Sequence, residues 1–310
     1  MEVLSLRPGE TSAAHEVSAR HRLRGLAPAL LSCDVLVSGG GGLIQDATSG
    51  RSLTYYLGVI RAARALRRRV LVYGQSLGPL SEGARRRVAR VLRGVPLGLR
   101  DAASLALARA LGLPATEVAD AALALPVPRG ESRDALVLVP RGGSRGATDA
   151  LVALGEAALA RGTRVETLAL HPARDEAERA RLAAALPGCE ELRVTRPLEA
   201  LAALAGARLV ASVRLHGLIL ACVAGVPHVG LAYDPKVQGF AERSRAACFP
   251  SPRDAAEARA LSASLVGVLA APTLDLEARD RLRSEAEVGL DWLVRSALIG
   301  PSSASAYTTA

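Results

Sequence analysis

The residues best placed to do chemistry form one short segment, Arg214-Leu215-His216-Gly217, in the run VASVRLHGLILACVAGVP. The apolar residues 208–213 predict a strand and the residues after it predict a helix, so both polar side chains lie at a helix N-terminus. Backbone N–H groups and the helix dipole favour an anion there. A guanidinium adds positive charge, and a histidine, with an unperturbed pKa of about 6.5, can transfer protons near neutral pH. A core histidine with one internal hydrogen bond is the alternative, but Arg214 at a buried sheet edge needs an anionic partner, which favours a binding site.

Two further cationic side chains follow predicted strands in the same half of the chain. Arg141 ends the apolar run 135–140 and is followed by two glycines, which suits the binding of a planar anion. Lys236, in the segment AYDPKVQGF, is the only lysine among 39 basic residues. Because all the other basic residues are arginines, this position is predicted to need a compact ammonium group.

In the first half of the chain, four glycines (39–42) follow the predicted strand 34–38. They predict a loop whose backbone can approach a ligand closely. Gln45 and Asp46 follow directly and would be available to a ligand, although Asp46 also suits a helix cap. A simple turn that lets the next helix pack on the sheet is the alternative.

The next predicted strand, 69–73, ends in the segment YGQSLGPL. Its glycines predict a second loop at the same sheet edge, in which Gln75 and Ser76 are available to hydrogen-bond a sugar hydroxyl. The alternative is a turn in which Ser81 caps the helix that follows.

Short apolar runs alternate with segments of helical period along the whole chain, which predicts parallel sheets covered by helices on both faces. The interruption PVPRGESRD (126–134) is the best candidate linker. We therefore expect an α/β fold with two Rossmann-like, doubly wound domains (1–128 and 135–296) that face a cleft, and a disordered tail (297–310).

The expected strands are 2–6, 34–38, 69–73, 95–99, 135–140, 164–170, 191–194, 208–213 and 227–232. The expected helices lie near 18–31, 52–67, 81–93, 102–112, 148–161, 174–186, 197–206, 215–225, 252–271 and 275–296.

The composition limits the function classes. Hydrophobic residues make up 50% of the 310 residues and charged residues 22%, which excludes a disordered or fibrous chain. Aromatic residues make up 3%, which argues against nucleic-acid modules that stack bases on aromatic rings. The net charge of +9 comes from scattered arginines rather than a basic arm, and it is compatible with a phosphate-bearing partner or an anionic membrane face.

Cysteine and histidine spacing gives no sign of a metal site. The four cysteines are far apart, and neither H-x-x-x-H, H-E-x-x-H nor D-x-D occurs. Separated cysteines predict free thiols in a reducing compartment. The chain start lacks the pattern of a secretory leader, and its most apolar window, 217–233, is too short to span a bilayer. We expect a cytoplasmic protein, with peripheral contact to the inner face of the membrane as an option.

The ordered set SGGGGLIQD, TSGRSL, YYLG, VYGQSLGPL, VRLHGLILA and GLAYDPKVQGF resembles the polysaccharide pyruvyl transferase family. It is most similar to the CsaB branch, which pyruvylates cell-wall polysaccharide in surface-layer anchoring. The resemblance covers about residues 1–290. It implies a two-domain fold like that of GT-B glycosyltransferases, phosphoenolpyruvate as donor, and a sugar with two hydroxyls as acceptor. The implied products are a cyclic pyruvate ketal and phosphate, with no metal or other cofactor.

The resemblance also implies roles for the residues above. The donor would bind at Arg214, Leu215, His216 and Gly217, with Arg141 as a second anion clamp and Lys236 as a phosphate contact. His216 would act as general acid or base while one sugar hydroxyl attacks C2 of the donor and the second displaces phosphate.

The acceptor sugar would face the N-terminal domain. The resemblance places it at Gly41, Gly42, Gln45, Gln75 and Ser52, with Asp46 as base for the sugar hydroxyl. A lipid-linked acceptor is one of the options that the sequence leaves open, and so is the oligomeric state.

Two departures from the family pattern stand out. Family members begin with a strand and a loop of the type G-x-x-G-x-x-N-x-G-D, whereas this chain begins at what resembles the second strand, MEVLSL. Loss of a βα unit of roughly 30 residues would expose an apolar sheet edge. A misassigned start codon and a degenerate, inactive variant are both consistent with it. The family's aromatic residue after the strand-tip arginine is replaced by Gly142, which bears on the alignment of Arg141.

Two rival functions remain open. A GT-B nucleotide-sugar glycosyltransferase would need a carboxylate for the ribose hydroxyls, for which Glu242 is the nearby candidate. A non-catalytic glycan- or anion-binding relative would bind ligand without releasing phosphate. A dinucleotide-dependent oxidoreductase is disfavoured because its glycine fingerprint is missing.

Overall fold

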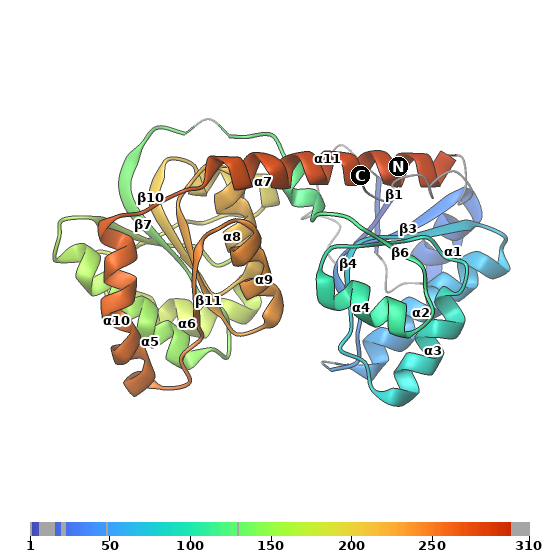
Figure 1. Cartoon of the computed structure of the whole chain (residues 1–310), viewed down its shortest axis with the longest axis horizontal. Coiled ribbons are helices and arrows are strands. Elements are labelled where there is room, and N and C mark those ends of the chain that lie inside the picture. The colour runs from blue at the N-terminus through green and yellow to red at the C-terminus, as the bar shows by residue number, and fades with distance from the viewer. Residues whose placement is uncertain (1, 6–15, 20–22, 48, 129, 299–310) are drawn as a thin grey trace. The chain divides into compact units, whose positions relative to one another are not determined.

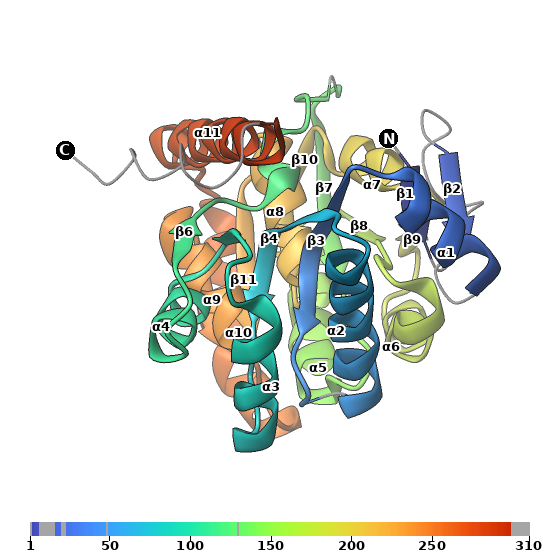
Figure 2. The same cartoon turned by 90° about the vertical axis from the view of Figure 1, so that its right-hand side faces the viewer.

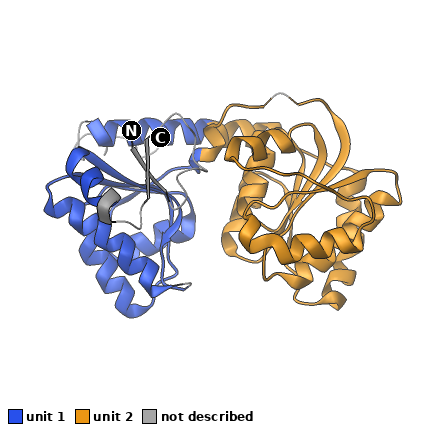
Figure 3. Ribbon diagram, turned by 180° about the vertical axis from the view of Figure 1, so that it is seen from behind, with its two compact units in different colours: residues 1–121, 284–310 blue, residues 122–283 orange. Residues whose placement is uncertain are grey.

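The structure is a computed structural model that describes residues 2–5, 16–19, 23–47, 49–128 and 130–298, with side chains from residue 26 onward. The chain forms two compact units (Figure 3). Unit 1 comprises residues 1–121 and 284–310, and unit 2 comprises residues 122–283. No described helix has an apolar stretch long enough to cross a bilayer.

The division differs from the expected domains of 1–128 and 135–296. It falls before the candidate linker, and the last part of the chain belongs to unit 1 instead of the C-terminal domain. The reason is packing, because Trp292 stacks on Tyr73, with ring centroids 6.3 Å apart. Of the tail expected to be disordered, 297–310, only the first two residues are described, and they end a helix.

Unit 1 contains a parallel sheet in the order β3-β4-β5-β6 and a separate parallel pair, β1-β2 (Figure 1). Helix α2 packs against β3 and β4, and α4 packs against β4 and β6 (Figure 2). The strands are β1 (Glu2–Ser5), β2 (Glu16–Ala19), β3 (Val35–Ile44), β4 (Arg69–Leu77), β5 (Leu97–Leu99) and β6 (Ala115–Glu117). The helices are α1 (Leu23–Ser32), α2 (Gly50–Ala65), α3 (Glu82–Leu92), α4 (Ala102–Ala110) and, from residue 284 on, α11 (Leu276–Leu298).

Unit 2 contains a six-stranded parallel sheet in the order β12-β11-β10-β7-β8-β9. Its strands are β7 (Arg133–Val139), β8 (Arg164–Thr167), β9 (Glu190–Glu191), β10 (Ala207–Ser212), β11 (His228–Ala232) and β12 (Ala247–Pro250). Its helices are α5 (Arg145–Leu159), α6 (Pro172–Ala185), α7 (Pro197–Leu204), α8 (Leu215–Val223), α9 (Pro235–Arg243), α10 (Ala255–Ala270) and the start of α11. A short 3-10 helix (Ala121–Ala124) lies at the unit boundary.

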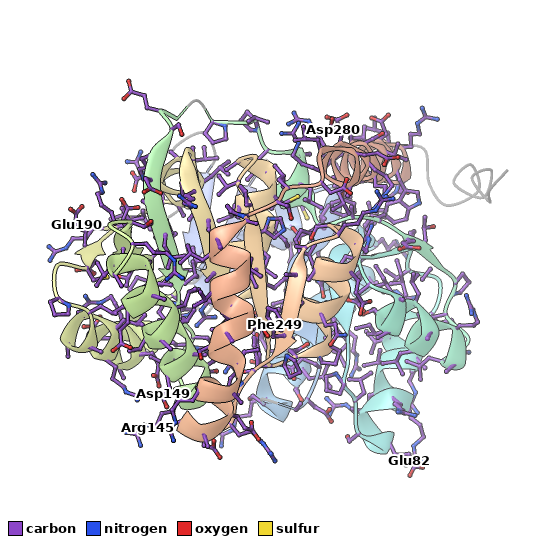
Figure 4. All side chains as sticks on the ribbon, turned by 60° about the vertical axis from the view of Figure 1, so that its left-hand side comes forward. Glu82, Arg145, Asp149, Glu190, Phe249 and Asp280 are labelled. Carbon is purple, nitrogen blue, oxygen red and sulfur yellow. The ribbon has the colours of Figure 1, made fainter. Side chains whose placement is uncertain are left out.

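Strand β7, in the middle of the unit 2 sheet, is apolar on both faces, as a covered parallel sheet requires. Leu136 and Leu138 pack in one cluster with α5, α6 and α10, and Val139 approaches α8 from the other face. Both side chains and backbone of 136–139 are inaccessible to solvent. Figure 4 shows α10 lying along α5, which carries Arg145 and Asp149. This sheet positions the candidate donor residues.

Candidate functional site

The strand order of unit 2 creates a switch point between β7 and β10. The chain runs from β7 outward through β8 and β9, and then from β10 outward in the opposite direction through β11 and β12. Loops that leave the carboxyl ends of β7 and β10 therefore diverge, and ligands of open α/β sheets bind at that place. Arg141 follows β7 and Arg214 follows β10. The structure thus brings these two predicted residues to the same edge of one sheet.

Arg214 is held by a carboxylate of its own chain. Its Nε donates to Oδ2 of Asp175 over 2.7 Å, and its Nη2 donates to Oδ1. The Asp175 side chain is fully buried, and the Arg214 side chain is 20% exposed. The anionic partner that the sequence predicts for Arg214 is therefore Asp175 of the same chain, so the need for a counter-charge does not by itself indicate a bound ligand. One end of the guanidinium is committed to this pair, and the rest of it is partly accessible.

Asp175 ties three loops of this sheet edge together. Its Oδ1 also accepts from the backbone N–H of Gly142 over 2.9 Å, and its Oδ2 accepts from that of His171 over 3.1 Å. The loop after β7 lies so close that a Cβ on Gly142 would be 1.9 Å from the carbonyl oxygen of Arg174. Only glycine fits there. Asp175 is not among the residues selected from the sequence, since its pairing with Arg214 is set by the fold.

The turn between β10 and α8 is built around a buried serine. Ser212 Oγ accepts from Arg214 N over 3.0 Å and donates to the Arg214 carbonyl over 2.7 Å. A Cβ on Gly217 would lie 2.2 Å from that Oγ, so glycine is needed for this close approach. Leu215 is buried and anchors the helix, whereas His216 is exposed in its first turn. The Arg214 side chain makes no capping hydrogen bond to α8.

Tyr233, which sequence reasoning did not select, joins the other two predicted cations. The guanidinium carbon of Arg141 lies 3.9 Å from the centroid of the Tyr233 ring, and Lys236 Nζ lies 5.9 Å from it. Arg141 also donates to Ser144 Oγ over 3.0 Å. Lys236 forms an ion pair with Asp234 over 3.2 Å. The segment YDPK contained a signal for this arrangement, namely an aromatic residue directly after a strand.

A hollow of about 420 Å3 lies beside this aromatic ring. Tyr233, Asp234, Gln238 and Glu242 are among the residues that line it. Gln238 donates to Glu242 over 3.0 Å, so the carboxylate is held in place by its own helix. The lining thus includes one aromatic residue and two carboxylates, and Arg141 and Lys236 lie near the same aromatic ring.

The predicted acceptor residues lie in unit 1, where the glycine run differs from expectation. Residues 39–42 continue strand β3 instead of forming a loop. The positive φ values of Gly40 (73°) and Gly41 (74°) allow a register shift between Gly41 and Ile44, after which pairing with β4 resumes. Gly42 is exposed and Gly41 is half-buried, so the backbone of this bulge is accessible.

Gln75 also lies inside a strand instead of a loop, because β4 continues to Leu77. Its side chain is fully buried, and Nε2 donates to the carbonyl oxygen of Ser38 over 2.7 Å and to its Oγ over 2.9 Å. The expectation that this amide is available on a surface loop is therefore wrong. Within the described residues, its Oε1 is buried without a hydrogen-bond partner.

Asp46 is bound to the start of α3. It accepts from the backbone N–H of Ser81 over 3.0 Å and from its Oγ over 2.5 Å. These hydrogen bonds lower the pKa of Asp46, which makes the carboxylate a weaker base. Ser81 caps α3 as the sequence predicts. Gln45 is half-buried, and Ser52 is exposed in the first turn of α2.

Unit 1 also has an ion pair, at the carboxyl edge of its sheet. Arg100, which follows β5, forms a salt bridge with Asp120, which follows β6, and its Nε donates to Ser76 Oγ over 3.1 Å. Arg100 is 8% exposed. Neither residue is among those selected from the sequence, because their pairing depends on β5 lying next to β6. In the described part of the chain, no group of three or more His, Cys, Asp or Glu side chains is arranged to hold a metal ion.

Comparison with solved structures identifies the fold. The UDP-GlcNAc 2-epimerase of Neisseria meningitidis is 12% identical with a TM-score of 0.60, and the match covers 94% of this chain and 87% of that one. The UDP-GlcNAc 2-epimerase of Methanocaldococcus jannaschii is 12% identical with a TM-score of 0.59, over 87% and 78% of the two chains. The HepE protein of Anabaena, solved with UDP, is 12% identical with a TM-score of 0.51, over 91% and 85%. At this identity the likeness concerns the fold alone.

The two parallel-sheet units and these neighbours place the protein in the GT-B class of α/β folds, as the sequence predicts. The family profile described as polysaccharide pyruvyl transferase matches residues 3–235, which is most of the chain. The chain belongs to this family. No curated protein matches the sequence significantly.

Proposed function

We propose that this transferase moves a pyruvyl group from phosphoenolpyruvate to a sugar of a cell-wall or secreted polysaccharide. The observation that carries the proposal is the carboxyl edge of the unit 2 sheet. There Arg141 and Lys236 share the Tyr233 ring, and Arg214 is fixed at the N-terminus of α8. Phosphoenolpyruvate carries a carboxylate and a phosphate, and two or three cations beside a helix N-terminus suit such a dianion.

The proposed reaction starts with proton transfer to the methylene carbon of phosphoenolpyruvate, which makes C2 electrophilic. One sugar hydroxyl forms a C–O bond to C2 and loses its proton. The C2–O bond to phosphate then breaks as the second hydroxyl adds to C2. The products are a cyclic ketal with a methyl group and inorganic phosphate. One hydroxyl proton replaces the proton given to carbon, and the other leaves with phosphate.

We assign the proton transfers to His216, because it is exposed in the first turn of α8, next to the anchored Arg214. Arg141 and Lys236 would bind the phosphate, and the accessible part of Arg214 would bind the carboxylate. Asp175 positions Arg214 and does not touch the donor. We place Gly41, Gly42, Gln45, Ser52 and Asp46 on the acceptor side, with Asp46 as a hydrogen-bond acceptor for the sugar, since its lowered pKa disfavours proton abstraction.

The first test is the release of phosphate from phosphoenolpyruvate on addition of a cell-wall polysaccharide precursor. We expect His216→Ala to lower this rate by about 100-fold or more, the usual effect of losing a general acid or base. Binding of phosphoenolpyruvate, followed by calorimetry, should change little. A variant that keeps more than about a tenth of the wild-type rate would contradict the role of His216.

A nucleotide-sugar glycosyltransferase is the second candidate, and one observation favours it. The hollow beside Tyr233 contains Glu242, a carboxylate of the kind that could hold ribose hydroxyls. The related fold of HepE was solved with UDP bound. Thermal stabilisation by phosphoenolpyruvate but not by UDP-sugars would support pyruvyl transfer. Stabilisation by UDP-sugars that is lost in Glu242→Gln would support the glycosyltransferase instead.

A further inference from the structure

A basic hollow lies at the amino-terminal edge of the unit 1 sheet, where α2 ends and β3 and β4 begin. Its volume is about 730 Å3. Arg64, Arg67, Arg68 and Arg69 line it, together with Asp34 and the last two residues of α11. Four guanidiniums against one carboxylate leave an excess of positive charge. The candidate acceptor residues follow the other ends of these strands, so the hollow is separate from them.

Three of the four guanidiniums are held in place by neutral groups. Arg64 Nη1 donates to the carbonyl oxygen of Val91 over 2.6 Å, Arg68 donates to that of Leu31, and Arg69 donates to that of Ala297. Carbonyl oxygens orient a guanidinium without cancelling its charge. This distinguishes the cluster from Arg214, which is paired with a buried carboxylate.

Arg67 occupies a backbone position that favours glycine. Its φ is 56°, and the N–H of Arg68 bonds to the carbonyl of Ala63 over 2.9 Å, which is the usual geometry after the end of a helix. The backbone of any residue other than glycine is strained at this φ. An arginine at this position places a positive charge at the hollow, and it lowers the stability of the folded chain.

Exposed leucines accompany the cations. Leu31 is 58% exposed, Leu66 is 40% exposed and Leu298 is 73% exposed. Leu31 supplies the carbonyl that holds Arg68, Leu66 precedes Arg67 in the chain, and Leu298 lines the hollow itself. Among the described residues that line the hollow, arginines outnumber carboxylates four to one. Solvent-exposed apolar side chains beside such an excess of arginines are what a surface of anionic phospholipid can bind, through its headgroups and its acyl boundary.

We propose that this basic hollow, with Leu31, Leu66 and Leu298, docks unit 1 on the surface of an anionic lipid bilayer. The docking is independent of the transfer reaction. It would be screened by salt, because the contacts between guanidiniums and headgroups lie at the protein surface. It requires both parts of the surface, the arginines and the leucines.

The test is co-sedimentation of the full chain with vesicles of phosphatidylcholine alone and with vesicles that also contain phosphatidylglycerol. We expect binding only to the anionic vesicles, and release by added salt. Arg67→Gly should weaken the binding by about fivefold, the effect of one basic residue near an anionic surface. Leu31→Ser, which leaves the charge unchanged, should also weaken it.

The matched control is Arg245→Gly in unit 2. Arg245 has a φ of 53° after α9, and the N–H of Ala246 bonds to the carbonyl of Ala241, so its backbone geometry and charge are the same. Its guanidinium pairs with Asp275 and Glu277. We expect this variant to bind vesicles like the wild type. Since both changes relieve strain, thermal unfolding at an unchanged or higher temperature would show that Arg67→Gly does not act by unfolding.

Three outcomes would overturn the proposal. The wild type could fail to sediment with anionic vesicles at low salt. The two glycine variants could weaken binding equally, which would mean that overall charge and not this surface is responsible. Inorganic polyphosphate could bind as tightly as the vesicles with no effect of Leu31→Ser, which would assign the hollow to a dissolved polyanion.

Discussion

At the scale of single residues, Asp175 organises the candidate donor site. It is fully buried, accepts hydrogen bonds from the backbone of Gly142 and His171, and pairs with Arg214. A buried carboxylate with all these partners fixes the direction of the arginine and the spacing of three loops. Its removal would leave Arg214 without its counter-charge and two N–H groups without acceptors.

We expect Asp175→Ala to lower the free energy of unfolding by about 3 to 5 kcal/mol, the usual result of breaking a buried ion pair. Phosphoenolpyruvate binding should weaken as well, since Arg214 is released. Denaturant unfolding and calorimetry measure the two effects. Glu176→Ala is the control, because the Glu176 side chain is 61% exposed and exposed ion pairs such as the one with Arg179 contribute little to stability. Equal effects of the two changes would contradict a special role for Asp175.

At the scale of elements, the junction of β10 and α8 depends on the absence of a side chain. Gly217 lets the helix approach Ser212 closely, and the serine in turn holds the backbone of Arg214. His216 lies between Ser212 and Gly217 in the chain, so this turn sets its position. The same reasoning explains Gly142, where the loop after β7 contacts the start of α6.

We expect Gly217→Ala to destabilise the protein by about 1 to 3 kcal/mol, because the new Cβ overlaps Ser212 Oγ. The shift of the turn should also lower the rate of phosphate release. Gly239→Ala in α9 is the matched control, since nothing lies within 4 Å of its Cβ position. That change should stabilise by up to about 1 kcal/mol through helix propensity. If Gly217→Ala leaves the free energy of unfolding in urea unchanged, the turn can adapt to the new side chain.

At the scale of the whole molecule, α11 begins in unit 2 and ends in unit 1. Trp292, the only tryptophan, stacks on Tyr73 of β4 and thereby reports on unit 1 alone. The Tyr73 hydroxyl is buried and has no hydrogen-bond partner in the described part of the chain. Burial and the charge of Asp120 raise the pKa of Tyr73 to about 12.

Unit 1 should therefore lose stability at alkaline pH. Between the ordinary tyrosine pKa of about 10 and the folded value of about 12, the unfolded chain ionises Tyr73 and the folded one does not, so stability falls as pH rises through this window. Urea unfolding followed by Trp292 fluorescence at pH 8 and pH 11 measures the loss. Tyr73→Phe should reduce the loss and, by removing an unpaired hydroxyl, stabilise unit 1 by about 1 kcal/mol at neutral pH. The same pH dependence in the variant would contradict this assignment.

Most elements could be predicted from the sequence because their signals are local. The apolar runs and helical periods indicate nearly all the helices and the central strands, and Ser81 caps α3 where the chain predicts a cap. Short strands such as β6 and β12 were missed, since pairing with a neighbouring strand defines them. The expected helix 18–31 also included part of β2. Helix α9 was missed although Asp234 and Pro235 form a start signal.

By itself the sequence determined the parallel α/β architecture, the residues that follow β7 and β10 and the resemblance to pyruvyl transferases, because hydrophobic periodicity and motif spacing are properties of the chain itself. Only the tertiary structure decided which charges meet. Asp175 and Arg214 are 39 positions apart, and β10 must lie next to β7 before their side chains can pair. The burial of Gln75 and the Tyr233 contact of Arg141 have the same origin: they depend on which strands become neighbours, and local chemistry does not specify that.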